Sequence, residues 1–381
     1  MTRGIGIAIT AAALLSGRLD TRPAQLEPVF LERTNMTPAQ SIVPAFCRGL
    51  LGRTTALPKR YGNLYGRIID PDNLRVAHER ARRGKAQYRS VQFVNANQEQ
   101  VLSDLHASLA DKAFTTSKYI TQTRVEGGKQ REIHKLPYYP DRIVHHAICN
   151  VCAPIWIKSL IRDTFQSLPG RGISDARRRV QRSIKAHGFT HALQVDVRKF
   201  YPSVDTGVLK QSIRRQIKCR DTLRLLDEII DSRPGLPLGN YTSQFFGNLY
   251  LSPLDWWAKQ TLGAKGYFRY CDDIVVLGHS PDELYQVQRR LSDQVENLHL
   301  ELKPDWRVLD LRVDGLDFCG YVFSGGPVTL RPRIASAFKR ASACPPSRRR
   351  HEKMAAYWGW IKPINALSLW GAYNPRGLVW S

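Results

Sequence analysis

The sequence predicts an α+β protein in which an antiparallel sheet packs on helices. The first observation is the segment YCDDIVVLG, Tyr270 to Gly278. Two aspartates there separate an aromatic lead-in from an apolar run, a pattern typical of two strands joined by a tight turn. The second is HALQVD, a buried-looking strand that ends at Asp196. The third is the helical spacing of apolar residues before, between and after these strands.

The charge of the chain favours a polyanionic partner. Its 381 residues include 57 Lys and Arg against 33 Asp and Glu, a net charge of +24. Such a field attracts nucleic acid. A membrane partner is disfavoured, because the sequence has no long amphipathic helix with a basic face. With 43% hydrophobic residues the chain is globular. Its seven scattered cysteines indicate a reducing, cytoplasmic compartment rather than a disulfide framework.

The N-terminal region is predicted to pass from irregular chain to helices. Residues 1–55 have weak periodicity and many Pro, Thr and Gly, which predicts a poorly ordered extension. Within it, residues 4–17 resemble a signal-peptide core, which we interpret as a non-functional leader or an over-extended start upstream of Met36. Helices are predicted over residues 70–85, which have an Asp start signal and a basic end, and over residues 95–112.

A β-hairpin is predicted next. Residues 119–136 alternate apolar and polar side chains about a Glu-Gly-Gly-Lys turn. Basic residues Lys129, Arg131 and Lys135 lie on or near its second strand. They form either a solvated basic face or an anion-binding one.

Residues 140–164 predict a long helix pair. Cys149 and Cys152 form a C-x-x-C there, but helical periodicity and the lack of a second ligand pair favour a buried helix face over a zinc site. In the loop 168–174, Arg171 stands between two glycines. Glycine allows close approach to a phosphate, although a simple turn explains the pattern equally well. A basic helix is predicted to follow.

The C-terminal half continues the alternation of helices and strands. Residues 235–255 read as a Gly/Pro-rich loop entering a helix, and residues 282–298 as an amphipathic helix. Residues 298–306 predict a strand that carries Lys303, and residues 315–323 a short strand pair. From Arg331 on, basic and aromatic residues interleave, as in a nucleic-acid-gripping helical module, although core packing would equally explain the aromatics.

Three carboxylates stand at the ends of predicted strands: Asp196 on one strand, Asp272 and Asp273 on a hairpin tip. A carboxylate embedded among apolar residues is costly unless a cation or a partner neutralises it. Hard, oxygen-preferring Mg²⁺ suits such ligands, and two ions ~3.5–4 Å apart serve nucleotidyl transfer. We therefore expect two Mg²⁺ ions, with Mn²⁺ as an alternative, at these aspartates.

Over roughly residues 60–375 the sequence resembles a reverse transcriptase. The resembling blocks, in the family's order, are VDVRKFYPSVD, the Gly-Leu-Pro-Leu-Gly loop with its Ser-Gln, YCDDIVVLG, LELKPDW and FCGY. The resemblance implies a right-hand polymerase. Its fingers would span residues 56–190, its antiparallel palm residues 191–325 with the loop 235–244, and its short helical thumb residues 326–381.

The resemblance also implies roles for individual residues. The three aspartates would bind the catalytic metals, and Val197 would lend a backbone carbonyl. Tyr201 matches the steric gate that excludes a ribose 2′-hydroxyl, and Lys303 matches a lysine that protonates pyrophosphate. The residues implied in deoxynucleotide binding are Lys129, Arg131, Tyr201, Leu238, Gly239, Ser243 and Gln244. The residues we assign to nucleic-acid contacts are Arg171, Arg331, Arg333, Lys339 and Arg340.

One departure narrows the resemblance. Most reverse transcriptases of bacterial introns and retroviruses have Gln-Gly where this chain has Leu238-Gly239. The pattern Leu-Gly-x-x-x-Ser-Gln is similar to the reverse transcriptases of diversity-generating retroelements, as are NLYGRIIDPDNL, DRIVHHAICNVCAPI and YWGWIK. That subgroup, bacterial or phage-encoded, copies a template-repeat RNA into cDNA and misincorporates opposite adenines for mutagenic retrohoming. Its implied partners are the template RNA, the cDNA/RNA hybrid, deoxynucleotides and a ring-forming basic accessory protein.

Two alternatives remain open. One is a reverse transcriptase of another bacterial lineage, such as a retron or group II intron enzyme, which Leu238 and Gln244 disfavour. A non-catalytic relic that binds RNA is disfavoured because binding alone requires neither the three aspartates nor Tyr201.

Overall fold

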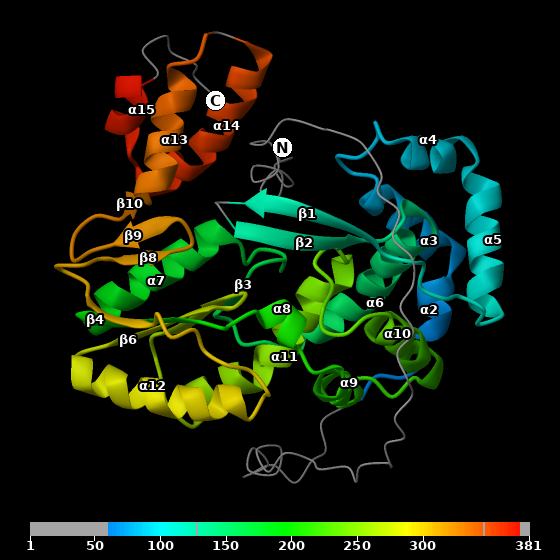
Figure 1. The fold of residues 1–381 in the computed structure, drawn as a ribbon, viewed down its shortest axis with the longest axis horizontal. Coiled ribbons are helices and arrows are strands. Elements are labelled where there is room, and N and C mark those ends of the chain that lie inside the picture. Colours follow the sequence, from blue (N-terminus) through cyan, green and yellow to red (C-terminus); the bar gives the residue numbers. More distant parts are fainter. Residues whose placement is uncertain (1–59, 127–128, 346, 374–381) are drawn as a thin grey trace, which may run out of the picture. The chain divides into compact units, whose positions relative to one another are not determined.

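The computed structural model describes residues 60–126, 129–345 and 347–373 (Figure 1). The extension predicted over residues 1–55 lies outside the described residues, as does the two-residue tip of the predicted hairpin. No helix within the described ranges is long and apolar enough to cross a membrane.

The chain divides into two compact units. Among the described residues, one unit ends at Gly326 and the other begins at Pro327. The larger unit is mixed α and β with a mainly antiparallel sheet, as expected for an α+β fold. The finer division into fingers, palm and thumb stays a prediction.

A five-stranded sheet forms the centre of the larger unit. Its order is β3-β5-β6-β4-β7, with a parallel β3–β5 pair and antiparallel pairs elsewhere. The strands are Thr164–Phe165 (β3), His191–Asp196 (β4), Tyr267–Tyr270 (β5), Asp273–Gly278 (β6) and Arg307–Asp310 (β7). The predicted hairpin about the two aspartates and the predicted strand ending at Asp196 are thus confirmed. β3, which precedes the predicted boundary at residue 190, also belongs to this sheet.

Helix α12 (Pro281–Glu296) packs against β4, β6 and β7. Its buried residues Leu284, Val287, Leu291 and Val295 recur at intervals of three and four, so they share one face. The helix begins where the sequence supplies start signals, with Ser280 accepting from the Glu283 N–H. Every residue of β6 after its first is buried, so both faces of this strand are covered, and α12 covers one of them.

A helical layer precedes the sheet in sequence. Its elements are α2 (Tyr65–Ile69), α3 (Pro71–Ala81), α4 (Arg89–Ala96), α5 (Gln98–Ala110), η1 (Tyr138–Arg142) and α6 (Ile143–Ser159). The start of α3 is as predicted, because the Asp70 carboxylate accepts from the Asp72 and Asn73 N–H groups. Helix α6 packs against α2, α3 and α11 (Tyr241–Gln260).

The helix pair predicted over residues 140–164 is wrong, because α6 is a single helix that continues through Pro154. Proline removes one intrahelical hydrogen bond. Here the helix buries side chains on nearly all sides, and tertiary packing of that kind outweighs the local loss. Cys149 and Cys152 are both buried on α6, as the helical periodicity predicted.

The predicted hairpin is present as β1 (Ile120–Glu126) and β2 (Lys129–Lys135), antiparallel with Ile120 opposite Lys135. The remaining helices of the larger unit connect these layers. They are α7 (Ile173–His187), α8 (Phe200–Ser203), α9 (Thr206–Arg214) and α10 (Arg220–Asp231).

The strand predicted over residues 298–306 is wrong. The structure has only an isolated bridge there, between Leu302 and Val197, and β7 begins later. His299 has φ +56°, which breaks an extended run, and Pro304 has no N–H for a ladder. The strand pair predicted over residues 315–323 is confirmed as β8 (Leu316–Phe318) and β9 (Tyr321–Phe323).

The smaller unit is mainly helical where it is described. It contains β10 (Thr329–Leu330), α13 (Pro332–Ser342), α14 (Arg348–Ile361), η2 (Lys362–Ile364) and α15 (Leu367–Tyr373). Its aromatic side chains pack on one another: the Phe338 ring is stacked on Trp370, with centroids 5.7 Å apart, and Trp370 contacts Trp358. Core packing therefore accounts for these aromatics.

Candidate active site

The antiparallel register of β4 and β6 places Asp196 directly opposite Asp273. Directly opposed residues share a face of the sheet, with Cβ atoms ~4.5–5.5 Å apart. Asp272 lies in the turn between β5 and β6, and its carbonyl accepts from the Val197 N–H at 3.3 Å. Three carboxylate-bearing residues and Val197 thus meet at one end of the central strands, as the sequence predicted for the aspartates.

Lys303 reaches the same end of the sheet. Its Nζ lies 2.6 Å from Asp196 Oδ2, and its backbone N–H donates to the Asp196 carbonyl at 2.8 Å. Burial raises the pKa of the Asp196 carboxyl; the hydrogen bond from Lys303 opposes this rise, and the charge of Asp272 adds to it. Lys303 therefore supplies positive charge where carboxylates crowd together.

The chemistry of these donors fits a hard divalent cation. Asp196 Oδ1 is buried and accepts no hydrogen bond in the structure, so one oxygen of this carboxylate has no hydrogen-bond partner. Carboxylate and carbonyl oxygens are the ligands that Mg²⁺ prefers. As the side chains stand, the described residues contain no group of three or more His, Cys, Asp or Glu that could hold a metal ion. The fit therefore rests on donor type and on the unsatisfied oxygen.

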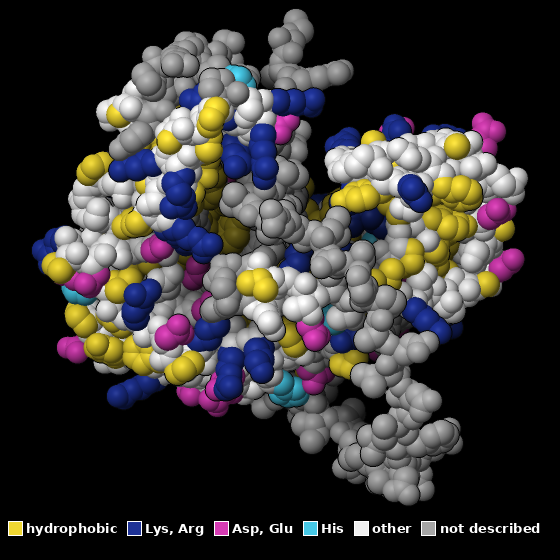
Figure 2. Space-filling view, turned by 45° about the horizontal axis from the view of Figure 1, so that its top comes forward, with side chains coloured by type: hydrophobic (Ala, Val, Ile, Leu, Met, Phe, Trp, Pro, Cys, Tyr) yellow, Lys and Arg dark blue, Asp and Glu magenta, His cyan; other side chains and the backbone are white. Residues whose placement is uncertain are grey.

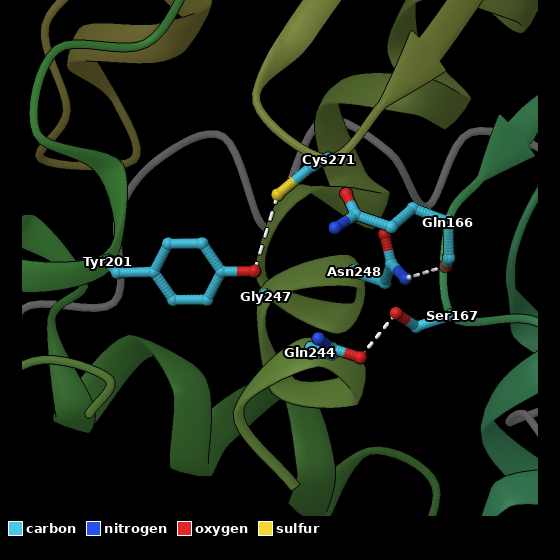
Figure 3. Close-up of a pocket in the computed structure, with 7 residues that line it drawn as sticks. All are labelled: Gln166, Ser167, Tyr201, Gln244, Gly247, Asn248 and Cys271. Atoms are coloured by element: carbon cyan, nitrogen blue, oxygen red, sulfur yellow. Dashed lines mark hydrogen bonds between the residues drawn. The ribbon is translucent and has the colours of Figure 1, made fainter. Parts of the chain in front are cut away.

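Tyr201 lies beside the turn and lines a small pocket (Figure 3). Its hydroxyl points toward Cys271, with 3.3 Å between Oη and Sγ. Burial and the neighbouring Cys271 raise the pKa of Tyr201, and burial together with Asp272 raises the pKa of Cys271 to about 12. Both groups are therefore neutral at physiological pH. The other residues lining the pocket are Gln166, Ser167, Gln244, Gly247 and Asn248.

Two polar contacts fix the wall of the pocket that faces Tyr201. Ser167 Oγ donates to Gln244 Oε1, and Asn248 Nδ2 donates to the Gln166 carbonyl at 3.2 Å. Gln166 and Ser167 both have positive φ, at 81° and 56°. Strained backbone of this kind persists where surrounding contacts enforce it, often at functional sites.

The Gly-Leu-Pro-Leu-Gly loop is tied at both ends to other parts of the site. The Leu236 N–H donates to the Tyr201 carbonyl at 2.7 Å, and the His134 N–H of β2 donates to the Leu238 carbonyl at 3.0 Å. Gly239 has φ +133°, and a Cβ there would lie 2.4 Å from the His134 oxygen. Only glycine fits at position 239. Through these two backbone hydrogen bonds the loop connects strand β2 to Tyr201 of α8.

The residues predicted to bind deoxynucleotides are only partly brought together. Gln244 lines the pocket beside Tyr201. Ser243 instead is buried, and its hydroxyl donates to the Pro237 carbonyl at 2.8 Å, which closes the loop. Leu238 is half-buried. Lys129 and Arg131 lie on β2, but their side chains are outside the described part of the chain.

Arg171, predicted to contact nucleic acid, braces its own turn. Its Nη1 donates to the Ile161 carbonyl at 2.8 Å, and its backbone carbonyl accepts from the Gln166 N–H. Burial, and then the charge of Arg162, lower the pKa of Arg171. The other four predicted contacts are in the smaller unit: Arg331 precedes α13, and Arg333, Lys339 and Arg340 are exposed on it. Lys and Arg side chains are also spread over the face drawn in Figure 2.

Sequence reasoning missed several residues of this site. Gln166, Ser167, Asn248 and Cys271 line the pocket, and Arg269 is fully buried beneath the turn. The arginine could have been noticed, because a charged residue inside the aromatic strand YFRY requires a buried partner. The partner, on a distant helix, leaves no comparable signal.

No family model matches this chain, and no curated protein matches it. Among solved structures, it is similar to apo telomerase from Candida tropicalis, with a TM-score of 0.46, 11% identity, and coverage of 67% of this chain and 56% of that one. It is also similar to telomerase from Candida albicans in complex with a TWJ fragment of telomeric RNA, with a TM-score of 0.44, 10% identity, and coverage of 64% and 55%. The chain spans little more than half the length of these telomerases. At this level of similarity, function has to be inferred from the residues of the site.

Proposed function

We propose that this protein is an RNA-directed DNA polymerase, a reverse transcriptase that transfers nucleotides by a two-metal mechanism. The observation that carries the proposal is the register of β4 and β6, which sets Asp196 opposite Asp273 with Asp272 in the adjoining turn. Three partly buried carboxylates at one end of a sheet repel one another, and a bound cation relieves this repulsion. Nucleotidyl transfer is a reaction that uses such a carboxylate set.

The three aspartates, with the Val197 carbonyl, would hold the metal. Bound Mg²⁺ or Mn²⁺ would lower the pKa of the attacking 3′-hydroxyl and stabilise the leaving pyrophosphate. Lys303 lies 2.6 Å from Asp196. It is therefore placed to carry a proton toward the phosphates that approach this carboxylate, the role that the resemblance implied.

Tyr201 would select the sugar of the incoming nucleotide. Its ring lines the pocket next to the turn that carries Asp272, and its hydroxyl is held by Cys271. A ring held in this way blocks the space beyond a deoxyribose and so excludes a 2′-hydroxyl. Lys129 and Arg131 on β2 would hold the triphosphate, because β2 is tied to the loop that also contacts the Tyr201 backbone.

The finer proposal is a polymerase of the diversity-generating retroelement type, which errs opposite template adenines. It rests on the sequence pattern from Leu238 to Gln244. Leu238 replaces an amide that other reverse transcriptases have at this place. An aliphatic side chain removes a polar anchor, which reduces discrimination between bases by ~1–3 kcal/mol.

The proposed partners are a template-repeat RNA and a ring-forming basic accessory protein, as the resemblance implied. Net charge supports the RNA partner, at +24 over the chain. A protein that neutralises several phosphates releases counterions, so its affinity for RNA should fall steeply as salt rises. An affinity that is flat in salt would contradict a polyanionic partner.

Primer extension on an RNA template tests the proposal. The purified chain, with the accessory protein present and absent, is given deoxynucleotides and a titration of Mg²⁺ or Mn²⁺. We expect DNA synthesis that depends on the metal and on the template. A chain that binds the RNA but extends no primer under any of these conditions would instead support the RNA-binding relic.

A further inference from the structure

A fully buried ion pair lies directly beneath the aspartate-bearing turn. Arg269 of β5 and Asp255 of α11 both have side chains with 0% exposure. Arg269 Nε donates to Asp255 Oδ1 at 2.7 Å and Nη2 donates to Oδ2 at 2.6 Å, which is a bidentate pairing.

The Asp255 carboxylate accepts two further hydrogen bonds. The Tyr267 hydroxyl donates to Oδ1 at 2.7 Å, and the Thr164 hydroxyl of β3 donates to Oδ2 at 2.8 Å. Each oxygen thus accepts two hydrogen bonds. Three residues therefore fix the position of the carboxylate: Thr164 of β3, and Tyr267 and Arg269 of β5.

The free end of the guanidinium reaches the turn itself. Arg269 Nη1 donates to the Cys271 carbonyl at 2.8 Å and to Asn248 Oδ1 at 3.1 Å. Cys271 has φ +60°, a conformation that a non-glycine residue adopts only when its surroundings enforce it. The peptide group that joins Cys271 to Asp272 is therefore held by a donor from below.

Stability alone does not account for this arrangement. Buried ion pairs repay their desolvation cost poorly, and well-packed apolar residues often replace them without loss. An apolar pair would fill the same space. It would supply no donor to the Cys271 carbonyl, and the strained turn would lose the contact that enforces it.

Asn248 extends the same network to the pocket. Its Oδ1 accepts from Arg269, while its Nδ2 donates to the carbonyl of Gln166, on the wall opposite Tyr201 (Figure 3). One guanidinium thus connects the turn before Asp272 to the pocket wall.

We propose that Arg269, locked by Asp255, is the positioning residue for Asp272: it fixes the Cys271–Asp272 peptide and so aims the carboxylate. The catalytic consequence rests on the proposed function, whereas the geometric claim does not. Loss of the guanidinium fork should free the turn while the rest of the sheet stays folded. Asp255, which does not contact the turn, should act only through Arg269.

The test is hydrogen exchange of the peptide that contains Cys271 and Asp272, together with the rate at which Cys271 is alkylated, both read by mass spectrometry. Arg269→Lys keeps the charge but loses the fork. Asp255→Asn unlocks the arginine, and Thr164→Val is a milder change that removes one hydrogen bond. Leu291→Ala is the control, because Leu291 is fully buried on α12 and has no part in the network.

We expect Arg269→Lys and Asp255→Asn each to speed exchange and alkylation at the turn roughly tenfold or more. Thr164→Val should speed both reactions at the turn by a smaller factor. Leu291→Ala should leave the turn protected from exchange and alkylation even where its melting temperature falls as far as that of Arg269→Lys. The double variant Arg269→Lys/Asp255→Asn should be no worse than the single ones. The proposal would be overturned if, under conditions where their free energies of unfolding are equal, Thr164→Val, Arg269→Lys and Leu291→Ala showed the same exchange and alkylation rates at the turn.

DNA synthesis measured on the same variants separates the two claims. Arg269→Lys should lower kcat with little change in the deoxynucleotide KM, because a misaimed Asp272 affects the reacting centre more than substrate binding. If the wild-type chain makes no DNA while the turn still loosens in Arg269→Lys, the proposed function fails and the positioning role stands.

Discussion

Asp196 and Asp273 are cross-strand partners in the antiparallel pair of β4 and β6. Cross-strand partners present their side chains on the same face of a sheet, so the two carboxylates share one small region although 76 positions separate them in the sequence. Asp272 is held next to them by the hydrogen bond from Val197 to its carbonyl. A nearby positive charge offsets the repulsion among these three carboxylates, and the ammonium group of Lys303 contacts Asp196.

Replacing Lys303 should change how the site responds to Mg²⁺. Lys303→Met removes a cation that competes for Asp196 Oδ2, so the Mg²⁺ concentration for half-maximal binding should fall. Half-exposed ion pairs are worth about 0.2–1 kcal/mol, which corresponds to a roughly 1.4- to 5-fold change. Calorimetric titration checks this. Arg198→Met, which removes the nearby exposed pair with Glu301, is the control, and an equal shift in both variants would contradict specific competition.

Gly239 of the loop should not tolerate a side chain. Alanine at 239 would place Cβ 2.4 Å from the His134 oxygen, in a backbone with φ +133°. We expect a loss of ~1–3 kcal/mol or more in the free energy of unfolding. Gly84→Ala is the matched control, because Gly84 also has positive φ (+67°) but no atom within 4 Å of the added Cβ. Denaturant unfolding of both variants isolates the collision; equal losses would show that the close approach to β2 is absent.

Leu238→Gln should lower misincorporation opposite template adenine. The loop is anchored through the Leu238 backbone carbonyl rather than its side chain, so the variant should fold. Restoring an amide should recover ~1–3 kcal/mol of discrimination. Sequencing of the cDNA measures the error spectrum, with Leu238→Met as the apolar control. An error spectrum identical in all three proteins would remove the basis for the retroelement subtype.

Asp205 should make stability depend on acid. Its carboxylate caps α9 through the Gly207 and Val208 N–H groups and pairs with His299 at 2.9 Å. Burial alone would raise the pKa of Asp205, but these hydrogen bonds lower it below the ordinary 3.8. A depressed carboxyl pKa stabilises the fold above that value, and this contribution is lost as the pH falls through the folded-state pKa.

Asp205→Asn keeps a capping side chain but removes the charge. The free energy of unfolding of this variant at pH 7 should therefore be lower than that of the wild type. The difference should be less than about 1 kcal/mol, because the site is partly exposed. The gap should close as the pH falls below 3.8. Thermal melting from pH 7 to pH 3 checks this, with Asp72→Asn, a carboxylate paired to exposed Arg75, as the control. A gap independent of pH would mean that the charge of Asp205 is not what stabilises α9.

Sequence reasoning located the aspartates because each interrupts an apolar run where a strand ends. Asp196, Asp272 and Asp273 could thus be placed on two strands, and the hairpin between Tyr270 and Asp273 followed from the polar pair in its middle. Their register could not be predicted, because a shift by one residue leaves the same pattern in each strand considered alone. The structure shows this register in the antiparallel pairing of β4 with β6.

Other parts escaped prediction because tertiary contacts decide them. The pattern of residues 298–306 favoured a strand, but the positive φ of His299 breaks it. Asp255 lies on α11 and Arg269 on β5, and no pattern in the sequence indicates that these two residues form an ion pair. Ser243 matched a substrate-binding position, yet its hydroxyl is used to close the loop on Pro237.

Primer extension by the aspartate variants tests the central claim most directly. Asp272→Ala and Asp273→Ala, compared with Asp293→Ala on the exposed face of α12, are assayed on an RNA template with Mg²⁺, and RNA affinity is measured in parallel. Asp272→Ala and Asp273→Ala should abolish DNA synthesis while RNA binding persists, and Asp293→Ala should synthesise as wild type does. Synthesis retained in Asp272→Ala or Asp273→Ala would contradict the assignment of these carboxylates as the metal-binding centre.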